Sequence, residues 1–408
     1  MARLSEKQRV SITILVAALG YFVDVFDLQL FSMLRISSLK DLGFSGDQLI
    51  TIGTQLLNWQ MAGMLCGGIL WGMLGDRKGR VYVLFGTILL YSLGNIANAF
   101  VTTIPAYAAA RFFTGLGLAG EIGAGITLVS ELLPKNTRGY GSSIIVGCGV
   151  MGPLVAGYMV DILDWRMCYI GGGVLGLLLL LLRISVSESG MYNAVSKKSS
   201  VARGHFQMLF NNRKRFLRYL CSICVGLPIW FIFGAVIIFS PEIATALGVT
   251  SPLKVTTSMI SCYIGMSLGG FISGLISQIF GNRKKVMAVF MLGVGAMLMT
   301  ILTLRGISSG LFYGLVLLMG FFAGYWTLFM TSAAEQFGTN LRATATSTAP
   351  NFVRASVILD TLLIAYLRPG YGVVGSIAIA SIVCFVIAFI ALWKLPETFG
   401  RDLDFIER

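Results

Sequence analysis

Long runs of apolar residues, separated by short polar stretches, recur along the whole chain. Twelve of these runs are long enough to cross a bilayer, whose hydrocarbon core of roughly 30 Å takes about 20 residues of helix. Apolar residues fill each run continuously rather than alternating, which favours helices over the strands of a barrel. The pattern predicts an all-α membrane protein with twelve transmembrane helices, at approximately 10–34, 48–74, 81–101, 106–131, 139–162, 166–186, 216–240, 254–278, 286–304, 311–335, 343–367 and 371–393.

Two motifs occur twice, about half a chain length apart. ELLPKNTR ends the fourth run and EQFGTNLR ends the tenth, so that Glu131 and Arg138 correspond to Glu335 and Arg342. GMLGDRKGR, after the second run, has a degenerate partner in GLISQIFGNRKK after the eighth. Duplicated halves in a membrane chain are typical of transporters whose site lies between the halves. We therefore predict two pseudo-symmetric six-helix bundles, at 1–186 and 216–408 with a short cytoplasmic tail, joined by a cytoplasmic linker at 187–215.

Composition and charge agree with a membrane protein. Hydrophobic residues make up 56% of the chain and charged residues only 12%, which excludes a water-soluble globular class. The net charge of +13 does not indicate nucleic acid, because most of the 31 Lys and Arg fall on one side of the predicted helices. This asymmetry follows the positive-inside rule and predicts an integral protein of the bacterial inner membrane with both termini in the cytoplasm.

The sequence offers little for catalysis or metal binding. His205, in the predicted linker, is the single histidine, and the seven cysteines lie almost wholly within the apolar runs. No nucleophile with a base, and no phosphate-binding loop, can be recognised. We expect no enzyme activity, no metal site and no cofactor.

GMLGDRKGR resembles the signature loop of the major facilitator superfamily, and further motifs of that family follow along the chain. RFFTGLGLAGE begins at Arg111, while ESG and PETFGRDL end the two halves as in the branch of sugar porters, organic-ion carriers and aromatic-acid proton symporters. DVFD in the first run resembles the DGxD element of the aromatic-acid and metabolite symporters, with Val25 in place of glycine. The resemblance implies alternating access around a central cavity in a monomer. It also implies a conformational latch, whose expected members are Asp76, Arg77, Arg80, Glu131, Arg138, Glu335 and Arg342.

Three carboxylates lie where a bilayer disfavours charge. Asp24 and Asp27 are one helical turn apart in the first run, and Glu121 is near the middle of the fourth. Each charge near the bilayer centre costs about 2.5–3.5 kcal/mol on insertion scales, so each needs a partner, water or a function. We predict that they couple transport to protons. The alternatives are a structural link between the aspartates and Arg111 or another internal arginine, and a bond from Glu121 to a neighbouring helix.

Arg354, near the middle of the eleventh run, is the predicted substrate contact. A guanidinium offers forked donors that fit a carboxylate and stays charged when buried. The alternative is a buried ion pair with Asp360 or Asp27. Arg111 and Arg35 lie nearer the helix ends and are expected to reach the membrane interface. Other predicted substrate contacts, which could equally serve helix packing, are Trp230, Tyr325, Trp326, Gln29, Asn58 and Asn351.

Internal acids together with an internal arginine favour a secondary transporter. The leading hypothesis is proton-coupled import of a small organic anion by alternating access, with the substrate, protons and the lipid bilayer as partners. A proton-driven exporter of drugs or amino acids uses the same acids and stays open. A uniporter of a neutral solute leaves the buried acids without a task, and a receptor without transport activity lacks a visible signalling domain.

Overall fold

The structure is a computed structural model that describes residues 6–133, 138–149, 151–182, 206–402 and 405–407. These residues are almost entirely helical and include no strand, which confirms the all-α prediction. Eight of the described helices are long and apolar enough to cross a membrane by themselves. One of these, the kinked segment of residues 342–394, makes two crossings. Among the other crossings, residues 47–78 form one continuous helix, and shorter helices placed end to end make the rest. The fold is thus the predicted arrangement of twelve transmembrane helices in two bundles.

A break at small residues divides one crossing of the N-terminal half. The predicted fourth helix is interrupted at Ala119 and Gly120, which places Glu121 in the first turn of a new helix. The helices of this half are α1 (Glu6–Asp41), α2 (Asp47–Lys78), α3 (Arg80–Ala99), α4 (Ile104–Leu118), α5 (Glu121–Leu132), α6 (Arg138–Gly149), α7 (Gly152–Ile162) and α8 (Trp165–Leu182).

The C-terminal half has its own irregularities. Pro228 lies inside α10 and removes a backbone donor, and the chain continues as a π-helical turn. Gly372, at φ 65°, bends a continuous helical segment into the last two crossings. The elements are η2 (Phe206–Leu209), α10 (Arg213–Phe231), η3 (Ile232–Ile237), α11 (Ser240–Leu247), α12 (Val255–Phe280), α13 (Arg283–Thr303), α14 (Ser309–Ala323), α15 (Trp326–Gln336) and α16 (Arg342–Lys394).

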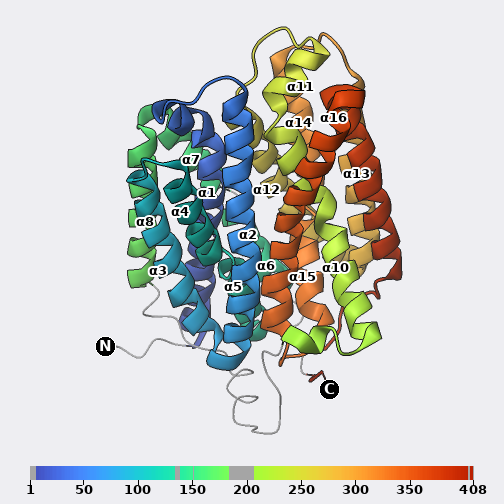
Figure 1. Cartoon of the computed structure of the whole chain (residues 1–408). Coiled ribbons are helices and arrows are strands. Elements are labelled where there is room, and N and C mark those ends of the chain that lie inside the picture. Colours follow the sequence, from blue (N-terminus) through green and yellow to red (C-terminus); the bar gives the residue numbers. More distant parts are fainter. Residues whose placement is uncertain (1–5, 134–137, 150, 183–205, 403–404, 408) are drawn as a thin grey trace.

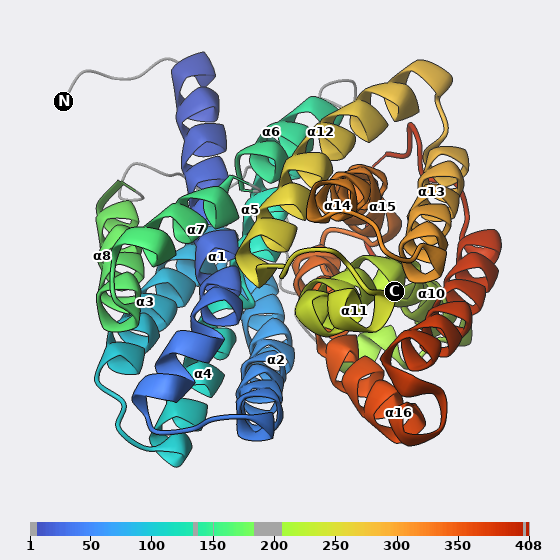
Figure 2. The same cartoon turned by 90° about the horizontal axis from the view of Figure 1, so that it is seen from above.

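The two halves stand side by side. Seen from above, α1–α8 lie on one side of the molecule and α10–α16 on the other (Figure 2). Across the boundary, α2 and α5 pack on α16, and α6 packs on α12. We call the end at which α1 and α10 begin the lower face, and the end that carries α11 the upper face (Figure 1).

Backbone contacts at glycine hold the halves together below the centre. A Cβ added to Gly72 would lie 3.0 Å from Cα of Thr344, and one added to Gly123 would lie 2.6 Å from Cα of Ser347. Such close approach is possible only without a side chain at the two glycines. The boundary is therefore closed toward the lower face.

Candidate functional site

Arg354 of α16 faces Asp24 of α1 across the boundary between the halves. Its Nη2 lies 3.5 Å from Oδ2 of Asp24, and both side chains are buried. Its Nη1 donates to Oδ1 of Asn351 at 3.4 Å, and the guanidinium carbon lies 5.4 Å from the ring centroid of Trp230. The guanidinium thus already contacts a carboxylate, an amide oxygen and a π face.

Aromatic rings surround this arginine. The Trp230 ring lies 6.4 Å from Trp326 and 5.6 Å from Phe233, and Phe233 lies 4.8 Å from Tyr263, all measured between ring centroids. Together with Tyr21, which accepts a hydrogen bond from Nε1 of Trp326 at 3.2 Å, these residues form what we call the cage. The cage takes side chains from both halves, so any movement of one half against the other changes its shape.

Further hydrogen bonds cross the boundary beside the cage. Nε2 of Gln29 donates to the Tyr263 hydroxyl at 2.5 Å, and Nδ2 of Asn351 donates to the Ala119 carbonyl at 2.6 Å. The remaining cavity at the cage, lined by Gln29, Trp230 and Phe233 among others, is about 10 Å³. This volume holds about one water molecule. The cage is therefore collapsed in this conformation.

Asp27 lies apart from the cage, inside the N-terminal half. Its Oδ1 would be 2.7 Å from a Cβ at Gly172, and the Asn95 amide lies beside it. Neither carboxylate oxygen accepts a hydrogen bond of normal geometry from the described residues, although Arg111 and Asp24 act on Asp27 electrostatically. The two aspartates of DVFD are thus divided, because Asp24 faces the C-terminal half and Asp27 its own half.

Arg111 is buried between aromatic rings. Its guanidinium carbon lies 4.9 Å from the Phe31 centroid and 5.8 Å from the Tyr169 centroid, while its three nitrogens find no hydrogen-bond partner among the described residues. Arg35 is also buried. The expectation that Arg111 and Arg35 reach the membrane interface is wrong, because neighbouring helices cover both side chains.

Other predicted site residues lie outside the cage. Glu121 accepts a hydrogen bond of 3.3 Å from Thr87 of α3. Tyr325 donates to the Val225 carbonyl at 2.9 Å within the C-terminal half. Asn58 lines a separate cavity nearer the upper face. The structure thus brings Asp24, Gln29, Trp230, Trp326, Asn351 and Arg354 together and leaves these three residues elsewhere.

The signature loop binds the start of α16 at the lower face. Oδ2 of Asp76 accepts hydrogen bonds from the backbone N–H of Thr344 at 2.8 Å and from its hydroxyl at 2.6 Å. Arg80 lies 3.4 Å from Oδ1 of Asp76 and donates to the Thr339 carbonyl at 3.3 Å. An anion at a helix N-terminus is favourable, so this contact stabilises the closed lower face. Arg77, beside them, is exposed.

The repeated motif of the C-terminal half makes contacts within its own half. Arg283 forms a bidentate ion pair with Glu335, in which Nε donates to Oε2 at 3.1 Å and Nη2 donates to Oε1 at 2.8 Å. Arg342 is buried and donates to the Ala334 carbonyl. Asn282, which stands where Arg80 stands in the first copy, caps α13 by accepting from Lys285 N–H. The side chains of Glu131 and Arg138 lie outside the described residues.

Glu397, in PETFGRDL, also caps α13. Its carboxylate accepts from the backbone N–H groups of Arg283 at 3.0 Å and Lys284 at 3.1 Å. Burial opposes its ionisation, but backbone donation, which also comes from Thr398 and Phe399, outweighs burial and holds the pKa of Glu397 below its usual value of 4.5. This carboxylate therefore holds the segment after α16 against the start of α13.

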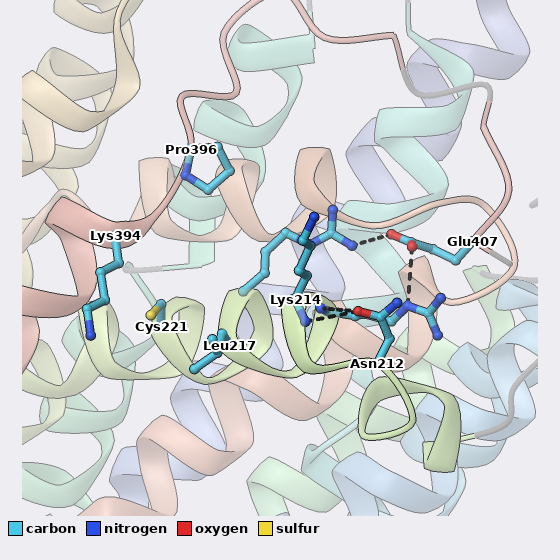
Figure 3. A pocket seen from close by; sticks show the side chains of 9 residues that line it. Asn212, Lys214, Leu217, Cys221, Lys394, Pro396 and Glu407 are labelled. Atoms are coloured by element: carbon cyan, nitrogen blue, oxygen red, sulfur yellow. Dashed lines mark hydrogen bonds and ion pairs between the residues drawn. The ribbon is translucent and has the colours of Figure 1, made fainter.

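A cavity of about 520 Å³ at the lower edge, between α10 and the end of α16, is separate from the cage. Glu407 lies across it and bridges two arginines, with 3.2 Å to Nε of Arg215 and 2.5 Å to Nη2 of Arg218 (Figure 3). Because this carboxylate already occupies a nitrogen of each guanidinium group, and the cavity does not lie between the halves, it is a weaker candidate for substrate than the boundary between them.

Sequence reasoning missed two members of the cage. Tyr21 lies three residues before Asp24, and therefore on the same helical face, which is a signal that could have identified it. Tyr263 is an ordinary aromatic residue of an apolar helix, and nothing in the sequence distinguishes it from residues that serve packing.

Comparisons with known proteins identify relatives over most of the chain. The family described as Major Facilitator Superfamily matches residues 17–262. A protein of Bacillus subtilis described as a niacin/nicotinamide transporter, NiaP, is 25% identical over 95% of this chain and 96% of its own. The cis,cis-muconate transport protein of Acinetobacter baylyi is 25% identical, with 97% and 95% coverage, and the 3-(3-hydroxy-phenyl)propionate transporter of Escherichia coli 28%, with 83% of each.

Among solved structures, the proton:xylose symporter XylE superposes with a TM-score of 0.69 over 98% of both chains. At 18% sequence identity, this similarity shows a shared fold and nothing about the substrate.

Proposed function

Because the chain belongs to the Major Facilitator Superfamily, and is thus an integral membrane transporter, we propose that it imports a small organic carboxylate together with protons. The observation that carries the proposal is Arg354, a buried guanidinium between the two halves, within an aromatic cage. The three relatives are named for niacin, muconate and hydroxyphenylpropionate, each a small acid with a flat unsaturated body. We assign a substrate of the same kind to this chain.

In the proposed binding step, the substrate carboxylate replaces Asp24 at Arg354. The present pair is long, at 3.5 Å, whereas charge-assisted N–H···O bonds of good geometry measure about 2.7–2.9 Å. A substrate carboxylate that approaches more closely gains the stronger bond, while Trp230 and Trp326 cover the flat body of the substrate. Gln29 supplies an amide at the edge of the cage, and Asn351, whose N–H groups donate to the Ala119 and Ser347 carbonyls, orients the guanidinium through its oxygen.

Proton coupling is assigned to the acids of the N-terminal half. Asp27 is buried without a hydrogen-bond donor of normal geometry, so its ionised form is costly and proton binding relieves that cost. Asp24, once displaced from Arg354, becomes a second buried carboxylate that gains from a proton. Asp27 is the proposed proton carrier, Asp24 links it to the substrate, and Glu121 is the reserve candidate.

The proposed orientation places the lower face in the cytoplasm of a bacterial cell. Most Lys and Arg residues lie on that side of the predicted helices, as the positive-inside rule requires. With the lower face closed, the present conformation is the one that receives substrate from outside. The proposed alternation opens the contacts of Asp76 and Arg80 while the upper face closes, in a transporter that works as a monomer.

Uptake by purified protein in vesicles tests the proposal. Radiolabelled nicotinate, cis,cis-muconate and 3-(3-hydroxyphenyl)propionate are offered separately, with and without an inward proton gradient. We expect at least one acid to accumulate above equilibrium, and a protonophore to abolish the accumulation. Accumulation only with the opposite gradient would indicate an exporter, and equilibration that ignores pH would indicate a uniporter.

A further inference from the structure

Above the collapsed cage, near the upper face, lies a larger and more polar cavity. It measures about 300 Å³, which is at the lower limit of ordinary ligand pockets. It lies between α2, the start of α11 and the middle of α16, and its lining includes Thr51, Thr54, Gln55, Asn58, Glu242, Thr361 and Arg368. In this conformation a small acid fits here and not in the cage.

A second, small cavity of about 10 Å³ lies between these two places. It shares Thr54 with the upper cavity, and it shares Ser32, Leu57 and Ile238 with the cavity at the cage. The three cavities therefore follow one another from the upper face toward Arg354. The middle one is the constriction, and Arg35 of α1 is the charged residue in its lining.

One nitrogen of the Arg35 guanidinium has no hydrogen-bond partner among the described residues. The residue is only 6% exposed, and the nitrogen, Nη1, is itself buried. The stem of the arginine fills the space that a side chain at Gly53 would take, since a Cβ there would lie 2.5 Å from its Cδ. The absence of a side chain at Gly53 of α2 thus leaves space for Arg35 between the upper cavity and the cage.

Glu242 of α11 opposes Arg35 from the other half. The two charges interact electrostatically, but no salt bridge joins them, and Oε2 of Glu242 is likewise buried without a partner among the described residues. An unpaired buried donor and an unpaired buried acceptor are each costly, and an anion placed at the guanidinium would satisfy the donor. The arrangement therefore points to a ligand carboxylate at Arg35.

We propose that Arg35 and the polar cavity above it form an entry subsite, where the carboxylate of an incoming organic anion binds before it passes to Arg354. This inference rests on the proposed function, because it takes the same class of substrate. Glu242 competes with the anion for Arg35 and repels it. Removing the charge of Arg35 should therefore weaken substrate capture, and removing the charge of Glu242 should strengthen it. If the two residues only held the fold together, both substitutions would weaken capture.

Initial uptake rates of nicotinate, measured over a range of concentrations in vesicles, test the subsite. For Arg35→Gln we expect KM to rise about tenfold or more, because one charge-assisted hydrogen bond is lost, while the maximal rate stays near the wild-type value. For Glu242→Gln we expect KM to fall. Gly53→Ala leaves both charges in place, but its methyl group displaces the stem of Arg35, so KM should rise here too.

Lys40→Gln is the matched control. It removes one positive charge from an exposed position on the same helix and should leave KM unchanged. Uptake of neutral nicotinamide, where it is measurable, should be the same in wild type and in Arg35→Gln.

The entry subsite is overturned if the wild type takes up nicotinate and KM is unchanged in Arg35→Gln. It is also overturned if KM rises in both Arg35→Gln and Glu242→Gln. Either result leaves the proposed function standing. Should Arg35→Gln fail to fold, Glu242→Gln and Gly53→Ala decide the question. If the wild type takes up none of the three acids, the proposed function fails, and the subsite with it.

Discussion

Arg354 and Asp24 belong to different halves of the molecule, yet their charged groups face each other at 3.5 Å in a buried boundary. A guanidinium in this position would be costly without an anion, and Asp24 supplies one while the transporter is empty. The length of the contact makes it easy to replace. The same pair therefore stabilises the closed boundary and keeps the arginine available to a substrate.

Replacement of Arg354 should abolish tight substrate binding. For Arg354→Gln we expect the Kd for a transported acid, measured by calorimetry, to rise at least about tenfold, since hydrogen bonds to charged groups contribute about 1.5–3 kcal/mol. Arg354→Lys keeps the charge but loses the planar fork, so an intermediate Kd is expected. Unchanged binding in both variants would remove Arg354 from the substrate site.

Asp24→Asn should affect binding in the opposite direction. The asparagine no longer competes for Arg354, so we expect a lower Kd for the acid than in the wild type. Accumulation against a gradient should fall at the same time, because displaced Asp24 is one of the proposed proton acceptors. Binding that weakens in Asp24→Asn would show that the carboxylate contributes to the shape of the cage rather than competing with the substrate.

Asp27→Asn should separate exchange from accumulation. Exchange of labelled for unlabelled substrate needs no net proton movement and should continue, while uptake driven by a proton gradient should be lost. Glu121→Gln serves as the comparison, because Glu121 has a hydrogen bond from Thr87 and should lose less. If Glu121→Gln stops accumulation and Asp27→Asn does not, the assignment of the proton carrier reverses.

The twelve crossings could be predicted because the bilayer imposes a length on every apolar run. The signature motif predicted Asp76 as a latch residue, but the helix whose N-terminus it meets, at Thr344, lies in the other half of the chain. Long-range pairs of this kind have no local signal. The pairing of Arg354 with Asp24, the division of Asp24 from Asp27, and the burial of Arg35 all depend on helices that are distant in sequence.

Some features of the fold and of the site give no distinct signal in the sequence. The break at Gly120 lies within an apolar run, where hydropathy gives no boundary. The cage residues Tyr21 and Tyr263 have the same composition signal as packing residues, and their role emerges only from the rings and hydroxyl groups around them. Charge in an apolar run was informative because it is costly there, whereas an aromatic ring is not.

Loss of the Asp76 contact should open the lower face. In a background where the exposed Cys66 and Cys148 are replaced by serine, Ser347→Cys provides a probe at the closed boundary against Gly123. We expect Asp76→Asn to increase its labelling by a water-soluble maleimide about tenfold, because charge-assisted hydrogen bonds to Thr344 are weakened.

Two further variants grade this effect. Thr344→Val removes the hydroxyl donor and keeps the backbone N–H, so a smaller increase is expected. Lys78→Gln, at an exposed neighbouring position, should leave the labelling rate unchanged. Equal rates in Asp76→Asn and Lys78→Gln would contradict a latch at Asp76.

Glu397 should make the stability of the folded protein depend on pH in the acidic range. Backbone donors outweigh burial and lower its pKa in the folded state, so its contribution is complete above the unfolded value of 4.5 and is lost as the pH falls through the lower folded pKa. Glu397→Gln should therefore reduce the unfolding temperature at pH 7 and show a smaller difference from wild type at the acidic end. Asp161→Asn, which changes an exposed carboxylate, should reproduce neither effect. A difference between Glu397→Gln and wild type that is constant from pH 7 down to the acid limit would mean that the side chain acts through its shape and not its charge.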